Sequence, residues 1–214
     1  MDQAEAFLFD QVPPSRRALI PTALKTAYAA AAAHIDDTPF LKVPSVQRGR
    51  IVQWAVDYGL AGLIQSGQWD ADFRWRYFEK PTGQYLEVLL SHSVVTVSQV
   101  AEPEKQPRDV RFRANRRLRN QGWLKGLPDP SGKVETLGVP HILLVHGHQD
   151  LNFAHLGLPN EDHAKGYLYR TPNLMQMPHE VAAPLYPIED TDVEAVMTLK
   201  EEIDKWRRDN ANDA

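Results

Sequence analysis

The sequence predicts an α+β domain in which helices at both ends of the chain pack on a mainly antiparallel sheet. Apolar residues recur at helical spacing through residues 15–67, and the period then changes to the alternation that is typical of strands. Near the C-terminus, Thr191 and Glu194 have the spacing of a capping box, which predicts a last helix over residues 191–208. We therefore expect residues 1–214 to form a single domain.

Two helices are expected in the N-terminal part of the chain. The first contains the alanine run at residues 29–33, because alanine has the highest helix propensity, and it ends near His34. Ser45 is a suitable N-cap for the second helix, and Gly67 is a suitable C-terminal stop. One face of the second helix is apolar and is expected in the core: Ile51, Val52, Ala55, Val56, Leu60, Leu63 and Ile64.

The sheet-rich region is expected to span residues 72–170. Aromatic residues alternate with arginines at residues 73–77, which predicts a strand with one buried side and one side facing solvent. Further strands are expected at residues 85–90, 94–97, 141–146, 151–158 and 167–170. The first three strands are predicted to pair antiparallel. Glu87 interrupts an apolar strand, so it is either a buried carboxylate or a residue of the solvent-facing side. Four prolines predict an irregular segment at residues 171–189.

Composition removes several functional classes. The chain contains no cysteine, which excludes disulfide scaffolds, cysteine nucleophiles and cysteine-ligated metals. No stretch is apolar enough to span a membrane and no secretory signal is recognisable, so we expect a cytoplasmic protein with no membrane partner. The P-loop, dinucleotide-binding and zinc-protease motifs are also absent from the sequence.

The most basic segment of the chain lies at residues 108–119. Six arginines and one aspartate give it a formal charge of +5, whereas the whole chain carries −4. Arginine has a planar fork that matches phosphate oxygens. We predict that the segment binds RNA or DNA through Arg108, Arg111, Arg113, Arg116, Arg117 and Arg119. Uncharged neighbours are expected to contact sugar and base edges: Asn115, Asn120 and Gln121.

Two other interpretations of this basic segment stay open. The arginines are equally suited to neutralising acidic residues, either within the protein or on an acidic partner protein, and they would also suit a small phosphorylated ligand. Arg74 and Arg76 bear on this choice, because the nucleic-acid interpretation is strengthened if they share a face of the sheet with the segment.

A second group of candidate residues lies at residues 146–155, which contain three histidines and one aspartate: His146, His148, Asp150 and His155. If residues 147–150 form the tip of a hairpin, His146 pairs with Leu151. His146 and His155 then face the same side of the sheet. These histidines are also explained as ordinary hairpin residues that hydrogen-bond to the backbone.

These two groups lead to three functional hypotheses. The first is a nucleic-acid-directed protein of prokaryotic or phage style, such as a small metal-independent RNase or toxin-like effector without a cofactor. Its acid–base residues would be His146, His148 and His155. The second is a hydrolase that holds Zn or Mn with His146, His148, Asp150 and His155. The third is a non-enzymatic protein-interaction module.

Overall fold

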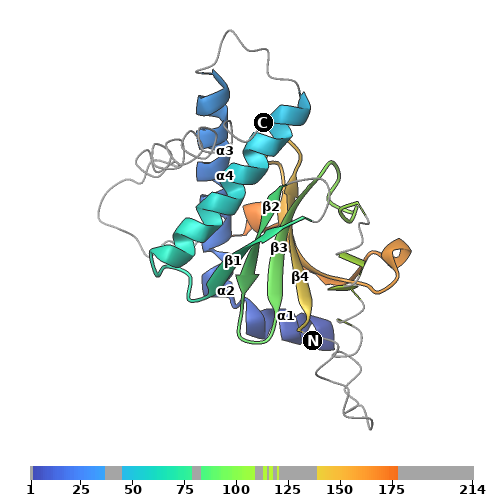
Figure 1. The fold of residues 1–214 in the computed structure, drawn as a ribbon. Coiled ribbons are helices and arrows are strands. Elements are labelled where there is room, and N and C mark those ends of the chain that lie inside the picture. The colour runs from blue at the N-terminus through green and yellow to red at the C-terminus, as the bar shows by residue number, and fades with distance from the viewer. Residues whose placement is uncertain are drawn as a thin grey trace.

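The computed structural model describes residues 2–36, 45–78, 83–108, 113–114, 116–117, 120 and 139–177. Helices pack on one side of a six-stranded, mostly antiparallel sheet, which confirms the predicted α+β class (Figure 1). The predicted C-terminal helix at residues 191–208 lies outside the described residues, as does the later part of the irregular segment, residues 178–189. In the part of the chain that the structure describes, no helix is both long and apolar enough to cross a membrane.

The helices are α1 (Gln3–Gln11), α2 (Pro14–Arg17), α3 (Leu19–Asp36) and α4 (Ser45–Gln65). Asp2 caps α1 by accepting a hydrogen bond from the Gln3 amide at 2.7 Å. Helices α3 and α4 pack against each other, and the small alanine side chains of α3 allow a close approach. The two expected helices are thus confirmed, whereas α1 was not predicted from the sequence.

The strands are β1 (Asp72–Tyr77), β2 (Gln84–Leu89), β3 (Val94–Val100), β4 (His141–Gly147), β5 (Ala154–Pro159) and β6 (Tyr167–Arg170). Two short 3-10 turns follow β5 and β6, at His163–Lys165 and Leu174–Gln176. The strands lie in sequence order, and every neighbouring pair is antiparallel except β3 and β4, which are parallel. A parallel pair needs a crossover connection, so the chain between β3 and β4 must return across the sheet.

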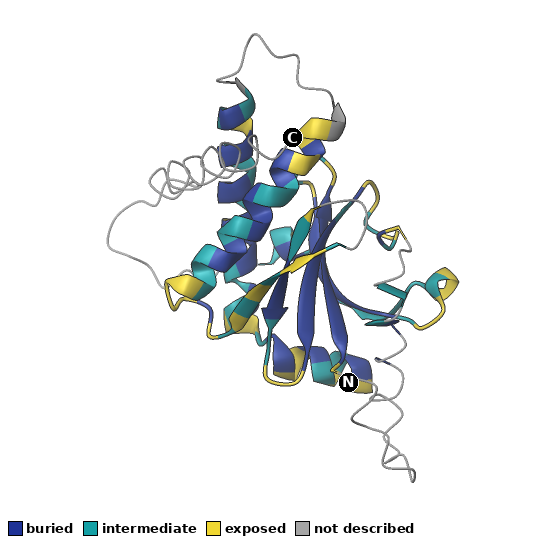
Figure 2. Ribbon diagram, viewed as in Figure 1, coloured by how far each residue is buried: buried dark blue, intermediate teal, exposed yellow. Residues whose placement is uncertain are grey.

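The two faces of the sheet differ in chemistry. The face that packs on α3 and α4 is apolar and forms the main core, with Leu86, Val88, Val95, Ile142, Leu144, Leu156 and Leu158 all buried. Figure 2 shows this burial in the central strands. The alternate residues point to the opposite face and include several buried polar groups: Glu87, Thr96, Ser98, His141 and His155. A smaller apolar cluster on this polar face contains Val100, Leu143, Val145 and Phe153.

The register of the β4–β5 hairpin differs from the prediction. His146 pairs with Ala154, and Val145 pairs with His155, so the expected pairing of His146 with Leu151 is wrong. The turn is closed by a hydrogen bond in which the Gly147 amide donates to the Phe153 carbonyl oxygen at 3.1 Å. The pairing is therefore displaced by three residues, and an odd displacement turns a strand's side chains to the other face.

Gly147 is required by this turn. A Cβ atom at Gly147 would lie 2.1 Å from the Asp150 carbonyl oxygen, and that oxygen belongs to the backbone and cannot simply rotate away. We expect Gly147→Ala to destabilise the protein by about 1–3 kcal/mol, as overpacking usually does. In contrast, Gly62→Ala in α4 meets no atom within 4 Å and should be neutral or stabilise by roughly 0.5–1 kcal/mol. Urea unfolding of both variants checks this; equal stabilities would contradict it.

Candidate anion-binding site

The described part of the arginine-rich segment lies across the polar face of the sheet, opposite α3 and α4 (Figure 1). Arg113 donates from Nη2 to the Ser98 hydroxyl oxygen of β3 at 2.8 Å. Arg116 donates from Nη2 to the Glu87 carboxylate of β2. Arg117 is buried, and its Nε approaches the Glu161 carbonyl oxygen at 3.4 Å. These arginines therefore attach the segment to the protein's own sheet.

Asn120 shows the same inward orientation. It is fully buried; its side-chain amide donates to the carbonyl oxygens of His141 at 2.9 Å and Pro159 at 3.1 Å. Its oxygen accepts from the His141 backbone amide at 2.6 Å. In the pairing of β4 with β5, the last pair is Leu143 with Gly157. Asn120 thus satisfies backbone groups of His141 and Pro159, which lie just beyond that pair. The expectation that Asn120 contacts sugar or base edges is wrong, because its buried side-chain amide is already bonded to backbone groups of the protein.

Glu87 is the centre of a group of four polar residues, which we call the Glu87 cluster: Glu87, Arg74, Arg76 and Arg116. The Glu87 side chain is completely buried. Its Oε2 accepts from Arg74 Nε at 2.8 Å and lies 3.6 Å from Arg76 Nε, while Oε1 pairs with Arg116. The Tyr85 hydroxyl also donates to Oε1, at 3.1 Å. Of the two sequence interpretations of Glu87, the structure supports the buried carboxylate.

The cluster has a surplus of positive charge. Three arginines and one carboxylate sum to a formal charge of +2. The Arg116 side chain is only 11% exposed, whereas Arg74 and Arg76 are 47% and 52% exposed. Both exposed arginines approach Glu87 through Nε. About half of each of these two arginine side chains is therefore open to solvent.

A second buried carboxyl group supports β2 from the other side of the sheet. Asp57 of α4 accepts from Gln53 Nε2 at 3.0 Å and from the backbone amide of Leu86, the residue before Glu87. Burial raises the pKa of Asp57 to about 8, so this carboxyl group is largely protonated at neutral pH. Asp57 holds β2 against α4 at the point where Glu87 faces the arginines.

His146 lies on the helix-facing side of β4 and is fully buried. Its Nδ1 is 2.7 Å from the Tyr28 hydroxyl oxygen, and that hydroxyl donates to the Gly147 carbonyl oxygen. Since the hydroxyl has one proton, Nδ1 of the neutral ring must be the donor to Tyr28. Burial lowers the pKa of His146 to about 4, so the ring is uncharged at neutral pH.

The other two predicted histidines lie elsewhere. His155 is buried on the polar face between the rings of Phe153 and Tyr167, with centroid distances of 6.0 and 5.6 Å. Burial, and secondly the charge of Arg170, lowers the pKa of His155 to about 4. His148 is exposed at the hairpin tip, with Nδ1 3.0 Å from the Gln99 side-chain oxygen. The structure therefore does not bring the three histidines into one site.

The predicted metal-binding set is not assembled either. His146 and His155 point to opposite faces of the sheet, as the register of β4 and β5 requires. Within the described ranges, no group of three or more His, Cys, Asp or Glu residues is placed to hold a metal ion. The arrangement of His146, His148, Asp150 and His155 therefore does not form the Zn or Mn site that the sequence suggested.

The other arginines of the segment are Arg108, Arg111 and Arg119. Arg108 is exposed, and its carbonyl oxygen accepts from Arg113 Nη1 at 3.0 Å. Arg111 and Arg119 lie outside the described residues. Of the six predicted arginines, Arg116 joins the Glu87 cluster, and Arg74 and Arg76 share its face of the sheet. A shared face is the arrangement that strengthens the nucleic-acid interpretation of the sequence.

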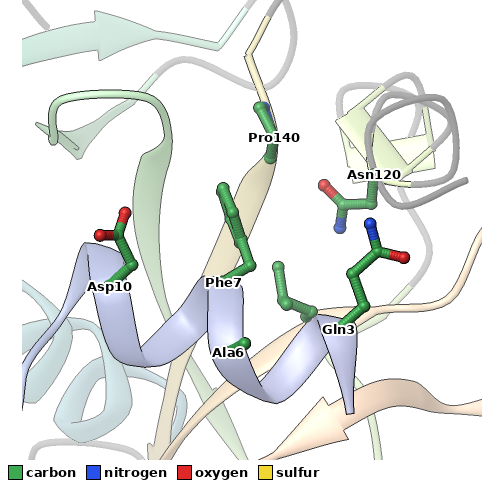
Figure 3. Close-up of a pocket in the computed structure, with 7 residues that line it drawn as sticks. Gln3, Ala6, Phe7, Asp10, Asn120 and Pro140 are labelled. Atoms are coloured by element: carbon green, nitrogen blue, oxygen red, sulfur yellow. The ribbon is translucent and has the colours of Figure 1, made fainter. Parts of the chain in front are cut away.

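A pocket of about 320 Å³ lies elsewhere on the molecule, between α1 and the start of β4 (Figure 3). Its walls are mainly apolar, and its lining residues are Gln3, Ala6, Phe7, Asp10, Asn120, Pro140 and Leu158. None of these residues belongs to the Glu87 cluster, so the pocket and the cluster are separate features.

Comparisons with family models, with curated proteins and with solved structures find no match to this chain. The function is therefore inferred from the chemistry of the site itself.

Sequence reasoning missed Asp57 and did not connect Glu87 with Arg116. The available signal for Asp57 was a carboxylate directly after Val56 and three residues before Leu60, both of which lie on the apolar face of α4. For Glu87, the signal was a carboxylate in an apolar strand that forms a hairpin with an arginine-bearing strand, since residues that pair across strands lie close together. In the structure Arg74 pairs directly with Glu87.

Loss of the Glu87 carboxylate should unfold the protein more easily. Glu87→Ala leaves the nearly buried Arg116 guanidinium without its anion, and breaking a buried pair in this way costs about 3–5 kcal/mol. Asp70→Ala is the matched control, because it removes an ion pair with Arg16 in which Asp70 is 94% exposed. Urea unfolding should show a large loss for the first variant and little change for the second. Similar losses would contradict the central role of Glu87.

Asp57 predicts a pH dependence of stability. Because the pKa of Asp57 rises from 3.8 to about 8 on folding, only the unfolded chain releases this proton between these values. The free energy of unfolding should therefore fall as pH rises through this range, by up to about 1.4 kcal/mol per pH unit. Asp57→Asn keeps an oxygen acceptor and should remove this slope, whereas Asp70→Asn should keep it. Identical pH profiles for Asp57→Asn and the wild type would disprove the assignment.

Proposed function

We propose that the protein binds RNA or DNA through the phosphate backbone at the Glu87 cluster. The observation that carries the proposal is the convergence of three arginines on one buried carboxylate, with the side chains of Arg74 and Arg76 about half-exposed. Arginine forks bind phosphate oxygens in a bidentate manner. The cluster therefore has the charge and the donor geometry for phosphate groups.

The positions of the two exposed arginines support a polymeric ligand. Arg74 and Arg76 are two residues apart on β1 and face the same side of the sheet. Their Cα atoms are expected to be roughly 6.6 Å apart, from the rise per residue of a strand. Two guanidinium groups arranged along one line suit successive phosphates of a chain better than a single small anion.

The buried carboxylate supports binding by ordering the donors. An arginine side chain loses several rotatable degrees of freedom when it binds a ligand. Glu87 holds Arg74 before any ligand arrives and lies within ion-pair distance of Arg76, so part of this entropy cost is already met in the free protein. Within the segment at residues 108–119, the proposal gives Arg116 a supporting role and assigns direct phosphate contact to the two arginines of β1.

The proposal concerns binding and contains no hydrolytic step. His146 and His155 are buried on opposite faces of the sheet, with the pKa of each near 4, and His148 lies at the hairpin tip. None of these three histidines is among the residues that contact Glu87, so the proposal gives them no acid–base role at the phosphate site.

The proposal is tested by fluorescence anisotropy with labelled RNA and DNA oligomers over a series of salt concentrations. Arg74→Ala/Arg76→Ala should weaken binding and reduce the slope of log K against log salt by about two, because each phosphate contact contributes about one. Arg48→Ala/Arg50→Ala removes the same charge from exposed positions of α4 and should change the slope little.

Two results would contradict this proposal. One is the absence of salt-dependent binding of the wild type to any oligomer at low salt. The other is an equal loss of affinity in both double variants, since that would mean that binding follows net charge and not the Glu87 cluster. Circular dichroism of each variant establishes that its fold is retained.

A further inference from the structure

Strand β1 forms the outer edge of the described sheet, beside α4 (Figure 1). The Phe78 amide donates to the Gly83 carbonyl oxygen at 2.9 Å, which fixes the hydrogen-bonding pattern of the β1–β2 hairpin. Successive residues of an antiparallel strand direct their backbone groups to opposite edges, so every second residue before Phe78 bonds to β2. The residues between them direct their N–H and C=O groups to the outer edge: Phe73, Trp75 and Tyr77. Within the described sheet no strand pairs with these groups.

The two faces of β1 differ in chemistry beside this open edge. On the polar face, the side chains of Arg74 and Arg76 are about half-exposed and belong to the Glu87 cluster, whose formal charge is +2. On the helix-facing side, Trp75 is half-buried against α4, and Tyr77 is 78% exposed. A strand that added to this edge would therefore have cationic neighbours on one face and aromatic neighbours on the other.

We infer that β1 binds an extended segment of a partner protein in which acidic residues alternate with apolar residues. In strand addition, backbone hydrogen bonds along the open edge provide affinity, and alternate side chains provide specificity. Because the side chains of a strand alternate between its two faces, the acidic residues would lie beside Arg74 and Arg76. The apolar residues would lie beside Trp75 and Tyr77.

Charge determines which kind of segment fits this edge. An added strand takes part of the two half-exposed guanidinium groups out of water, and carboxylates on that strand would compensate with charge-assisted hydrogen bonds. Basic residues at the same positions would meet a cluster that already has a surplus of positive charge, and like charges on neighbouring strands are destabilising. This inference goes beyond the proposed function, because it gives the same two arginines a protein ligand and does not depend on phosphate binding.

The first test measures, by fluorescence anisotropy, the binding of the full chain to a labelled peptide in which glutamate and valine alternate. A peptide with lysine in place of each glutamate is the matched control ligand and should bind about tenfold more weakly, or less. Arg74→Ala/Arg76→Ala should remove the preference for the glutamate peptide. Arg48→Ala/Arg50→Ala, at exposed positions of α4, should retain it.

The second test changes the backbone of the peptide. Successive amides of a strand point to opposite edges, so only every second amide of the peptide can donate to β1. One glutamate–valine peptide is N-methylated at its glutamates, and another is N-methylated at its valines. One of the two should lose about tenfold or more in affinity, whereas the other should bind as the unmethylated peptide does.

Tyr77→Pro tests the same contact from the side of the protein. Proline removes the outward N–H of residue 77 and is compatible with an edge strand. Tyr77→Ala is the matched variant, because it also removes the ring but retains the N–H. Tyr77→Pro should bind the glutamate peptide about 2- to 10-fold more weakly than Tyr77→Ala. Circular dichroism checks that both variants fold, and the methylated peptides test strand addition on the wild type itself.

The outcomes separate this inference from the proposed function. Equal binding of the glutamate and lysine peptides would exclude an acidic partner. Equal effects of the two methylation patterns, or equal affinities of the two Tyr77 variants, would exclude strand addition at β1. Salt-dependent binding of an oligonucleotide without any binding of the glutamate peptide would overturn this inference and keep the proposed function, whereas the reverse result would overturn the proposed function and keep this inference.

Discussion

A buried carboxylate imposes the strictest requirement on this structure. Glu87 has no exposed surface, and an ionised carboxylate removed from water is tolerated only when cations and hydrogen-bond donors surround it. The donors come from β1, from β2 and from the segment that crosses the polar face. Thus the Glu87 carboxylate connects three parts of the chain, and the arrangement of the arginines in the Glu87 cluster depends on its position.

The topology explains why the crossing segment reaches this place. The parallel pairing of β3 and β4 requires the intervening chain to return to the edge where β3 began. The face covered by α3 and α4 is already occupied, and the described residues of the connection make their contacts on the other face. Arg113, Arg116 and Asn120 then satisfy polar groups of β2, β3, β4 and β5, so these described residues of the connection are held on the polar side of the sheet.

Local patterns predicted the elements of this fold but not the contacts between distant residues. Alternating side chains located β1, short apolar runs located β4, β5 and β6, and helical spacing located α3 and α4. The turn after β4 was not predictable, because its length depends on how closely Gly147 approaches the Asp150 carbonyl oxygen. For the site, basic composition identified the arginines. Whether an arginine faces solvent or a buried carboxylate depends on a partner such as Glu87, which lies 29 residues from Arg116.

The position of β1 at the end of the strand order has a consequence for self-association. In the described sheet, β1 pairs only with β2, so its other edge presents backbone donors and acceptors on which a strand of another molecule could add. Charged side chains on an outer strand discourage such pairing, because the added strand would have to remove them from water. Asp72, Arg74 and Arg76 are exposed along this strand. The same arginines that we propose to bind phosphate therefore also protect the chain from forming sheets with its own copies.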